Sequence, residues 1–161
     1  MGLGLAHQIF SPVDELLNSF VNTSLIFLGS DLSPIIQSTY SSELSTTSAT
    51  FSRTDCAAFA FYYEALQFTL TVNGSFAFYS ESEMDTIGSI HEESFNPLNP
   101  SVNLIASANN EFQRGQLGLR IFTQVNRTYI LVVTTELLVE RGNFTIIVFG
   151  PAHVELKRIS K

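Results

Sequence analysis

The stretch Leu66-Gln67-Phe68-Thr69-Leu70-Thr71-Val72 alternates strictly, with apolar side chains at even positions and polar ones at odd positions. This period of two is typical of a β-strand that has one face on a core and the other in water. Asn73-Gly74 follows, a pair that favours the two positive φ angles of a type I′ turn. Phe76 and Phe78 then resume the alternation. We therefore expect a β-hairpin centred on Asn73-Gly74.

Similar patterns continue toward the C-terminus. Residues 117–125 alternate, and after a turn residues 128–135 are apolar on both faces, which predicts a central strand covered on each side. A further turn leads into an apolar strand at 144–149, and Val154 and Leu156 are expected in a last short strand. No helical period occurs between these segments. The pattern indicates an all-β domain built as an antiparallel two-sheet sandwich.

The N-terminal part of the chain differs from this pattern. Ser11-Pro12 supplies an N-cap and a proline at the first helical position, and apolar residues from Val13 to Val21 follow helical spacing. A short helix is predicted at about 12–22. Residues 38–48 are rich in hydroxyl side chains and are typical of a linker. We therefore assign residues 1–46 to a helix and a Ser/Thr-rich linker, and residues 47–161 to the β-sandwich.

Composition excludes several classes of protein. The chain has 161 residues, enough for one domain, and its 8 basic and 15 acidic residues give a net charge of −7. Nucleic-acid binding is not expected, because it needs clustered Lys and Arg. No apolar stretch is long enough to cross a bilayer, and no signal peptide is recognisable at the N-terminus. The single cysteine, Cys56, leaves the redox compartment open.

Four Asn-x-Ser/Thr triplets provide candidate N-glycosylation sites. They lie at Asn22, Asn73, Asn126 and Asn143. Asn73 and Asn126 fall in predicted turns, where a glycan can project without disturbing a core. These positions favour an extracellular or cell-surface location.

Several short motifs together resemble the pre-peptidase C-terminal family of β-sandwich domains, over residues of about 50–155. The motifs are Tyr62-Tyr63-Glu64-Ala65-Leu66-Gln67, Asn73-Gly74-Ser75-Phe76, Met84-Asp85-Thr86-Ile87-Gly88, Leu104-Ile105-Ala106-Ser107, Thr128-Tyr129-Ile130-Leu131-Val132-Val133 and Gly142-Asn143-Phe144-Thr145. The resemblance implies a jelly-roll-like, non-catalytic accessory module of secreted or surface proteins. It also implies kinship with calcium-dependent collagen-binding modules.

A calcium site is one interpretation of the acidic residues. Five carboxylates gather within thirteen residues, at Glu81, Glu83, Asp85, Glu92 and Glu93. In the family pattern the Asp that matches Asp85 is followed later by an acidic loop, which in this chain reads Ala108-Asn109-Asn110-Glu111 and has lost acids, so the site implied is a weak one. The predicted ligands of a weak Ca²⁺ site are Asp85, Glu92, Asn109 and Asn110, since Ca²⁺ accepts carboxylate and amide oxygens. The alternative is a solvated acidic surface, and no other cofactor is indicated.

Catalytic machinery is not apparent in the sequence. Glu92 and Glu93 are adjacent and would face different ways on a strand, and His7, His91 and His153 lack the spacing of a zinc motif. His91 is expected to be an exposed surface histidine, and the alternative is a pH-responsive neighbour of the acidic cluster. The function predicted is therefore non-catalytic adhesion, or carbohydrate or protein binding, outside the cell. The alternative is a structural spacer that packs against a larger protein and has no ligand.

Overall fold

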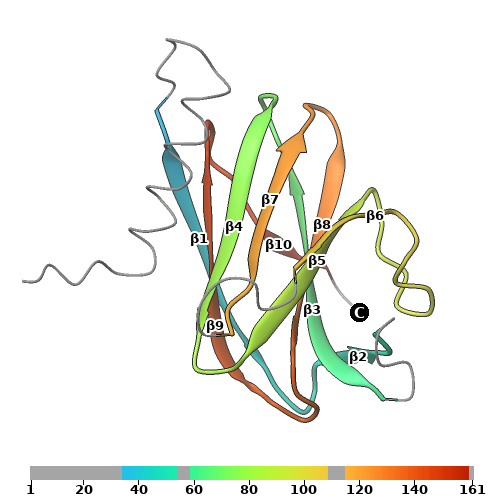
Figure 1. Cartoon of the computed structure of the whole chain (residues 1–161). Coiled ribbons are helices and arrows are strands. Elements are labelled where there is room, and N and C mark those ends of the chain that lie inside the picture. The colour runs from blue at the N-terminus through green and yellow to red at the C-terminus, as the bar shows by residue number, and fades with distance from the viewer. Residues whose placement is uncertain (1–33, 54–58, 109–114, 160–161) are drawn as a thin grey trace, which may run out of the picture. The chain divides into compact units, whose positions relative to one another are not determined.

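The computed structural model describes residues 34–53, 59–108 and 115–159. These residues form ten strands and no helix, arranged in two antiparallel sheets (Figure 1). The four-stranded sheet has the order β1-β9-β4-β7, with β1 at Ile36–Leu44, β9 at Gly142–Gly150, β4 at Gly74–Ser82 and β7 at Gly118–Thr123. The six-stranded sheet has the order β10-β3-β8-β5-β6, with β10 at Lys157–Arg158, β3 at Phe61–Thr69, β8 at Thr128–Thr135, β5 at Thr86–Glu92 and β6 at Leu104–Ala108. The short strand β2, at Ala49–Phe51, also pairs with β3.

The chain passes from one sheet to the other at nearly every connection. Strands β4, β7 and β9 belong to the four-stranded sheet, and β3, β5, β6 and β8 belong to the six-stranded one, so that β5 to β6 is the one direct connection within a sheet from β3 to β9. This alternation, with each sheet made of strands far apart in sequence, is the arrangement of a jelly roll. The predicted all-β, jelly-roll-like sandwich is confirmed.

The predicted hairpin at Asn73-Gly74 is wrong. The flanking strands β3 and β4 lie in different sheets and do not pair, although their apolar positions alternate as expected. Neither residue of the pair has a positive φ. Instead, the Asn73 side-chain oxygen accepts a hydrogen bond from the Val125 backbone N–H at 2.7 Å. A Cβ at Gly74 would lie 2.6 Å from Cγ of Pro151, so glycine is needed here for close approach.

The core lies between the two sheets and is rich in aromatic side chains. Phe68, Phe76, Phe78 and Phe144 are at most 2% exposed, and the ring centroid of Phe68 lies 5.1 Å from that of Phe78. Strand β8 is buried along both faces, as predicted for a central strand: Leu131 and Val133 join this core. Its alternate residues, Ile130 and Val132, pack with Phe51 and Phe61 on the outer face of the six-stranded sheet.

The segment predicted as a linker is instead the first strand of the sandwich. Strand β1 pairs with β9 along its whole length, from Ile36 opposite Gly150 to Leu44 opposite Gly142. Leu44 is fully buried, and the buried hydroxyl of Ser38 accepts a hydrogen bond from the Val154 backbone N–H at 2.9 Å. Hydroxyl side chains suit this edge because neighbouring strands give them hydrogen-bond partners. The predicted boundary at residue 47 is therefore wrong, and the compact unit begins at Pro34.

Two other predictions concern the chain ends. The predicted helix at 12–22 lies outside the described residues. Val154 and Leu156 are buried as expected, but they are not in a strand, and the last strand, β10, follows them. Among the described residues, no helix has the length and apolar character needed to span a membrane.

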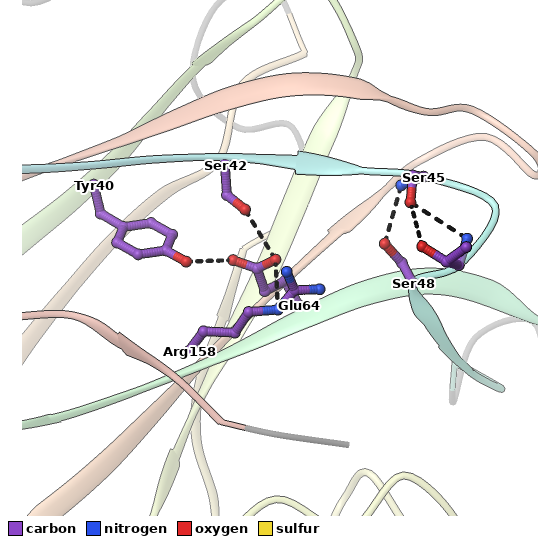
Figure 2. A network of polar contacts seen from close by, with 7 residues as sticks. Tyr40, Ser42, Ser45, Ser48, Glu64 and Arg158 are labelled. Atoms are coloured by element: carbon purple, nitrogen blue, oxygen red, sulfur yellow. Dashed lines mark hydrogen bonds and ion pairs between the residues drawn. The ribbon is translucent and has the colours of Figure 1, made fainter.

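A buried carboxylate joins the two sheets at their β1 and β3 sides (Figure 2). Glu64 of β3 is 2% exposed, and it accepts hydrogen bonds from the hydroxyls of Tyr40 at 2.7 Å and Ser42 at 3.0 Å, both on β1. Nε of Arg158 on β10 lies 3.2 Å from Glu64 Oε2, the oxygen that also accepts from Ser42. Burial, followed by the hydrogen bond and the charge of Glu64, raises the pKa of Tyr40. The carboxylate thus connects three strands and both sheets.

Glu64→Gln should lower the free energy of unfolding by about 2 kcal/mol, because an amide cannot accept from both hydroxyls and pair with the guanidinium. Urea unfolding measures the change. Glu43→Gln is the matched control, since Glu43 is an exposed residue of β1; its effect should stay within about 0.5 kcal/mol. Equal stabilities of the two variants would contradict the structural role given to Glu64.

Candidate functional site

The outer face of the six-stranded sheet carries a hollow of about 190 Å³. Its base is formed by outward residues of β5 and β8, where Ile87 lies opposite Thr134 in the register. Strand β6 and the loop before it border one side, and Phe51 and Arg53 border the other. The described residues that line it are Phe51, Arg53, Ile87, Gly88, Ser89, Pro100, Leu104, Ser107, Ala108 and Thr134. The hollow therefore combines apolar walls with three hydroxyls and one cation.

Arg53 is held firmly at the edge of this hollow. Its Nη1 donates to the backbone carbonyls of Thr135 at 3.0 Å and Glu136 at 3.1 Å. The guanidinium carbon lies 4.6 Å from the centre of the Phe61 ring, a cation–π contact. Its Nη2 also lies 3.8 Å from a carboxylate oxygen of Glu136. These contacts place a positive charge at a defined position, at little further entropic cost for a ligand that meets it.

An aromatic cluster stands beside the hollow and continues its Phe51 wall. The rings of Phe51, Tyr63 and Phe95 contact one another edge to face, with centroids 5.1 to 5.5 Å apart. Phe95 belongs to the loop between β5 and β6, so the cluster ties this loop to β2 and β3. The border of the hollow is therefore packed against the sheet.

His91 fixes the same loop from inside. Its Nδ1 lies 3.1 Å from the Val102 carbonyl, and its Nε2 lies 2.9 Å from the Ser89 hydroxyl. A carbonyl oxygen only accepts, so Nδ1 carries the proton and Nε2 accepts from Ser89. Since the hydroxyl of Ser89 donates to His91, its lone pairs are available to an incoming donor in the hollow. The tautomer of His91 thereby directs the Ser89 O–H toward the ring and leaves the Ser89 oxygen as an acceptor toward the hollow.

The expectation that His91 is exposed is wrong. The side chain is fully buried, and its ring centroid lies 4.9 Å from that of Phe95. Burial lowers the pKa of His91, because the charged ring is disfavoured away from water; the Val102 carbonyl opposes this effect in part. Alternation along β5 places His91 on the same outward face as Ile87 and Ser89, and the loop between β5 and β6 covers it.

The structure does not bring all the predicted calcium ligands together. Asp85 precedes β5 and Glu92 ends it, so six residues of extended chain lie between them and their Cα atoms are roughly 23 Å apart. Glu92 is instead 3.0 Å from Nη1 of Arg127. Asn109 and Asn110 lie outside the described residues. Within the described residues, no group of three His, Cys, Asp or Glu side chains is close enough to hold a metal ion.

Three of the four predicted glycosylation sites lie in described parts of the chain, and all three are exposed. Asn73 lies between β3 and β4, Asn126 lies in the turn between β7 and β8 with φ of 65°, and Asn143 lies near the start of β9. Asn22 lies outside the described residues. None of the three lines the hollow.

Sequence reasoning did not find the residues of the hollow. Arg53, Ser89 and Thr134 come from three separate segments, with no motif that links them. A partial signal exists in β5, where Ser89 and His91 share one face with Ile87, while Gly88 and Ile90 lie on the other face. The sequence also gives no sign that Glu64 is a buried hydrogen-bond acceptor, because it stands as a single charge between aromatic and apolar residues.

Comparison with known proteins adds no assignment. No protein-family model matches the chain, and no curated protein matches it significantly. The functional argument therefore depends on the geometry of the site.

Stability should fall as the pH is lowered through the titration range of His91. The ordinary pKa of 6.5 applies to the unfolded chain and the folded pKa is lower. Below about pH 6.5 the unfolded chain therefore binds a proton that the folded chain resists, and above it this group contributes nothing. Urea unfolding at pH 7.5 and 5.5 measures the decrease in the free energy of unfolding, which should be smaller in His91→Asn than in the wild type. His153→Asn is the control, because His153 is exposed; an unchanged loss in His91→Asn would refute this role.

Proposed function

We propose that this sandwich is a non-catalytic recognition module, outside the cell or on its surface, that binds a carbohydrate or a protein through the hollow on the six-stranded sheet. The observation that carries the proposal is the composition of that hollow. Arg53, Ser89, Ser107 and Thr134 provide polar groups beside the aromatic wall of Phe51. Such a mixture suits a ligand with hydroxyl groups and an apolar face, which describes a sugar ring or a polar peptide side chain.

A binding role is better supported than a catalytic one. Among the described residues that line the hollow, Arg53 alone is ionisable, and its guanidinium already donates to two backbone carbonyls. General acid–base catalysis needs a group that exchanges a proton near neutral pH, which a guanidinium does not do. Ser89 donates to His91 Nε2, as the serine of a nucleophile–base pair would, but His91 Nδ1 donates to the Val102 carbonyl and not to a carboxylate that would stabilise a charged ring.

The extracellular location is supported by the exposed triplets and by the family resemblance. Asn73, Asn126 and Asn143 are exposed and lie outside the hollow, so glycans at these positions would leave it open. Membership of the pre-peptidase C-terminal family stays a proposal, in agreement with the jelly-roll order of the strands.

A weak calcium site remains part of the proposal in a smaller form. Asp85 lies against Gly115, whose φ is +68° and where a Cβ would overlap the Asp85 carboxylate. The segment just before Gly115 contains Asn109 and Asn110. We therefore keep Asp85, Asn109 and Asn110 as ligands, and omit Glu92 because it pairs with Arg127.

The size of the hollow favours a second candidate function. Pockets for small ligands usually enclose about 300 Å³ or more, and this hollow has about 190 Å³. A spacer that packs against a larger protein needs no ligand pocket. The two candidates differ in whether the isolated protein binds a glycan or a peptide at all.

Filling the hollow should abolish binding without unfolding the domain. Ser107→Trp places a large side chain at an exposed residue of the lining, and Thr71→Trp makes a comparable change at an exposed residue away from it. On glycan and extracellular-matrix protein arrays, we expect the wild type and Thr71→Trp to bind the same ligand, and Ser107→Trp to lose at least about tenfold in affinity. The absence of any ligand for the wild type would favour the spacer.

Millimolar Ca²⁺ should raise the melting temperature by a few degrees relative to EDTA, because an ion that binds only the folded chain stabilises it by about 1 kcal/mol. Asp85→Asn should remove the difference. Glu92→Gln should keep it, since Glu92 is assigned to the pair with Arg127. Identical midpoints for the wild type would eliminate calcium from the proposal.

A further inference from the structure

The four strands at the ends of the two sheets differ in how they are protected. Strand β1 contains Glu43, β7 contains the exposed Arg120, and β10 consists of Lys157 and Arg158. Charged side chains at sheet edges discourage pairing with strands from other molecules. Strand β6, with the sequence Leu104-Ile105-Ala106-Ser107-Ala108, has no charge and no proline. Among the described strands at a sheet edge, this charge is missing from β6 and from the three-residue β2, which pairs with β3 alone, and β6 is the longer of the two.

The surroundings of β6 are also uncharged and partly apolar. Residues 94–110 contain no Asp, Glu, Lys or Arg, although the chain as a whole has a net charge of −7. Leu104 is 40% exposed and Ile105 is 45% exposed, and in the preceding loop Val102 is 41% and Leu98 is 94% exposed. On its outer side β6 pairs with no strand among the described residues. Backbone groups and apolar side chains are therefore presented together at one edge.

We propose that β6 is a self-association edge, where it pairs antiparallel with β6 of a second copy of this chain about a twofold axis. The pairing would extend the six-stranded sheet across both molecules. Two copies of an acidic protein repel each other, and this repulsion is weakest where they meet through uncharged surfaces. An antiparallel pair of identical strands also gives each copy the same contacts, as a closed dimer requires. A charged peptide would find no complementary charge at this edge.

The local geometry limits the strength of the dimer. Opposite β5, the register shifts between Ile90 and His91, so Ile105 is an extra residue and the regular part of β6 is short. We therefore expect a weak dimer, with a dissociation constant on the order of tens to hundreds of micromolar.

The dimer also has a consequence for recognition, which depends on the proposed function. Leu104, Ser107 and Ala108 of β6 line the hollow. Pairing through β6 would place the hollows of two copies on one continuous sheet, so that a repeating ligand could bind both. Two linked sites raise the apparent affinity without any new contact.

Sedimentation equilibrium of the full chain over a range of concentrations tests the pairing directly. We expect a monomer–dimer equilibrium, and a dissociation constant raised at least about tenfold in Ile105→Lys. Phe122→Lys is the matched control, because Phe122 is 70% exposed on β7, at an end of the other sheet, and the charge change is the same. That variant should dimerise like the wild type.

Amide hydrogen exchange of the wild type provides a second readout that needs no variant. Exchange at residues 104–108 should slow as the concentration rises, while exchange in β7 should not change. A chain that stays monomeric throughout would overturn the proposal. So would a dimer that forms without protection of β6, or one that Ile105→Lys leaves unchanged. If the wild type dimerises through β6 but binds no glycan or peptide, only the proposed function is refuted.

Discussion

The burial of β8 on both of its faces is the constraint on which the other features depend. Its inward residues, such as Leu131 and Val133, complete the core between the sheets. Its outward residues Ile130 and Val132 support an apolar layer, and Thr134 of the same face forms part of the hollow. A sheet face that would otherwise be solvated is thus covered by Phe51, Phe95 and the loop after β5. The candidate site exists because β8 carries apolar residues on both of its faces.

Several buried polar groups hold this arrangement in one register, since their hydrogen-bond partners lie on other strands or loops. Glu64 bonds to Tyr40 and Ser42 across the sheets. Near the C-terminal end of β4, the hydroxyl of Ser80 accepts from the Leu117 backbone N–H at 2.8 Å. The side-chain amide of Gln116 donates to the carbonyls of Ser82 and Met84. A slip of one residue would leave these groups buried without partners, at a cost of about 1 to 3 kcal/mol each. The polar contacts therefore select among packings that hydrophobicity alone would permit.

The sequence was informative where a side chain reports its own environment. Alternation identified the strands that contain Phe68, Phe78 and Leu119, and the continuous apolar run identified β8 as central. Alternation does not say which sheet a strand joins, so it predicts a hairpin at Asn73-Gly74, where the chain instead crosses from one sheet to the other. The hydroxyl-rich sequence of β1 predicts a linker, because the partners that stabilise this strand, including Glu64 and Val154, are distant in sequence. The hollow was hidden for the same reason: its lining is assembled from segments that meet only in the folded chain.

The loop between β5 and β6 shows how the core, the hollow and the β6 edge are related. His91 holds the Val102 carbonyl, Phe95 packs on Phe51 and Tyr63, and the backbone N–H of Glu92 donates to the Asn103 carbonyl at 2.8 Å. These contacts set where β6 begins, and β6 lines the hollow and forms the end of the sheet. A change in the protonation of His91 would therefore act on both surfaces at once, because a charged ring is disfavoured in the buried site that anchors the loop. The hollow and the β6 edge are thus connected in this fold through one buried side chain.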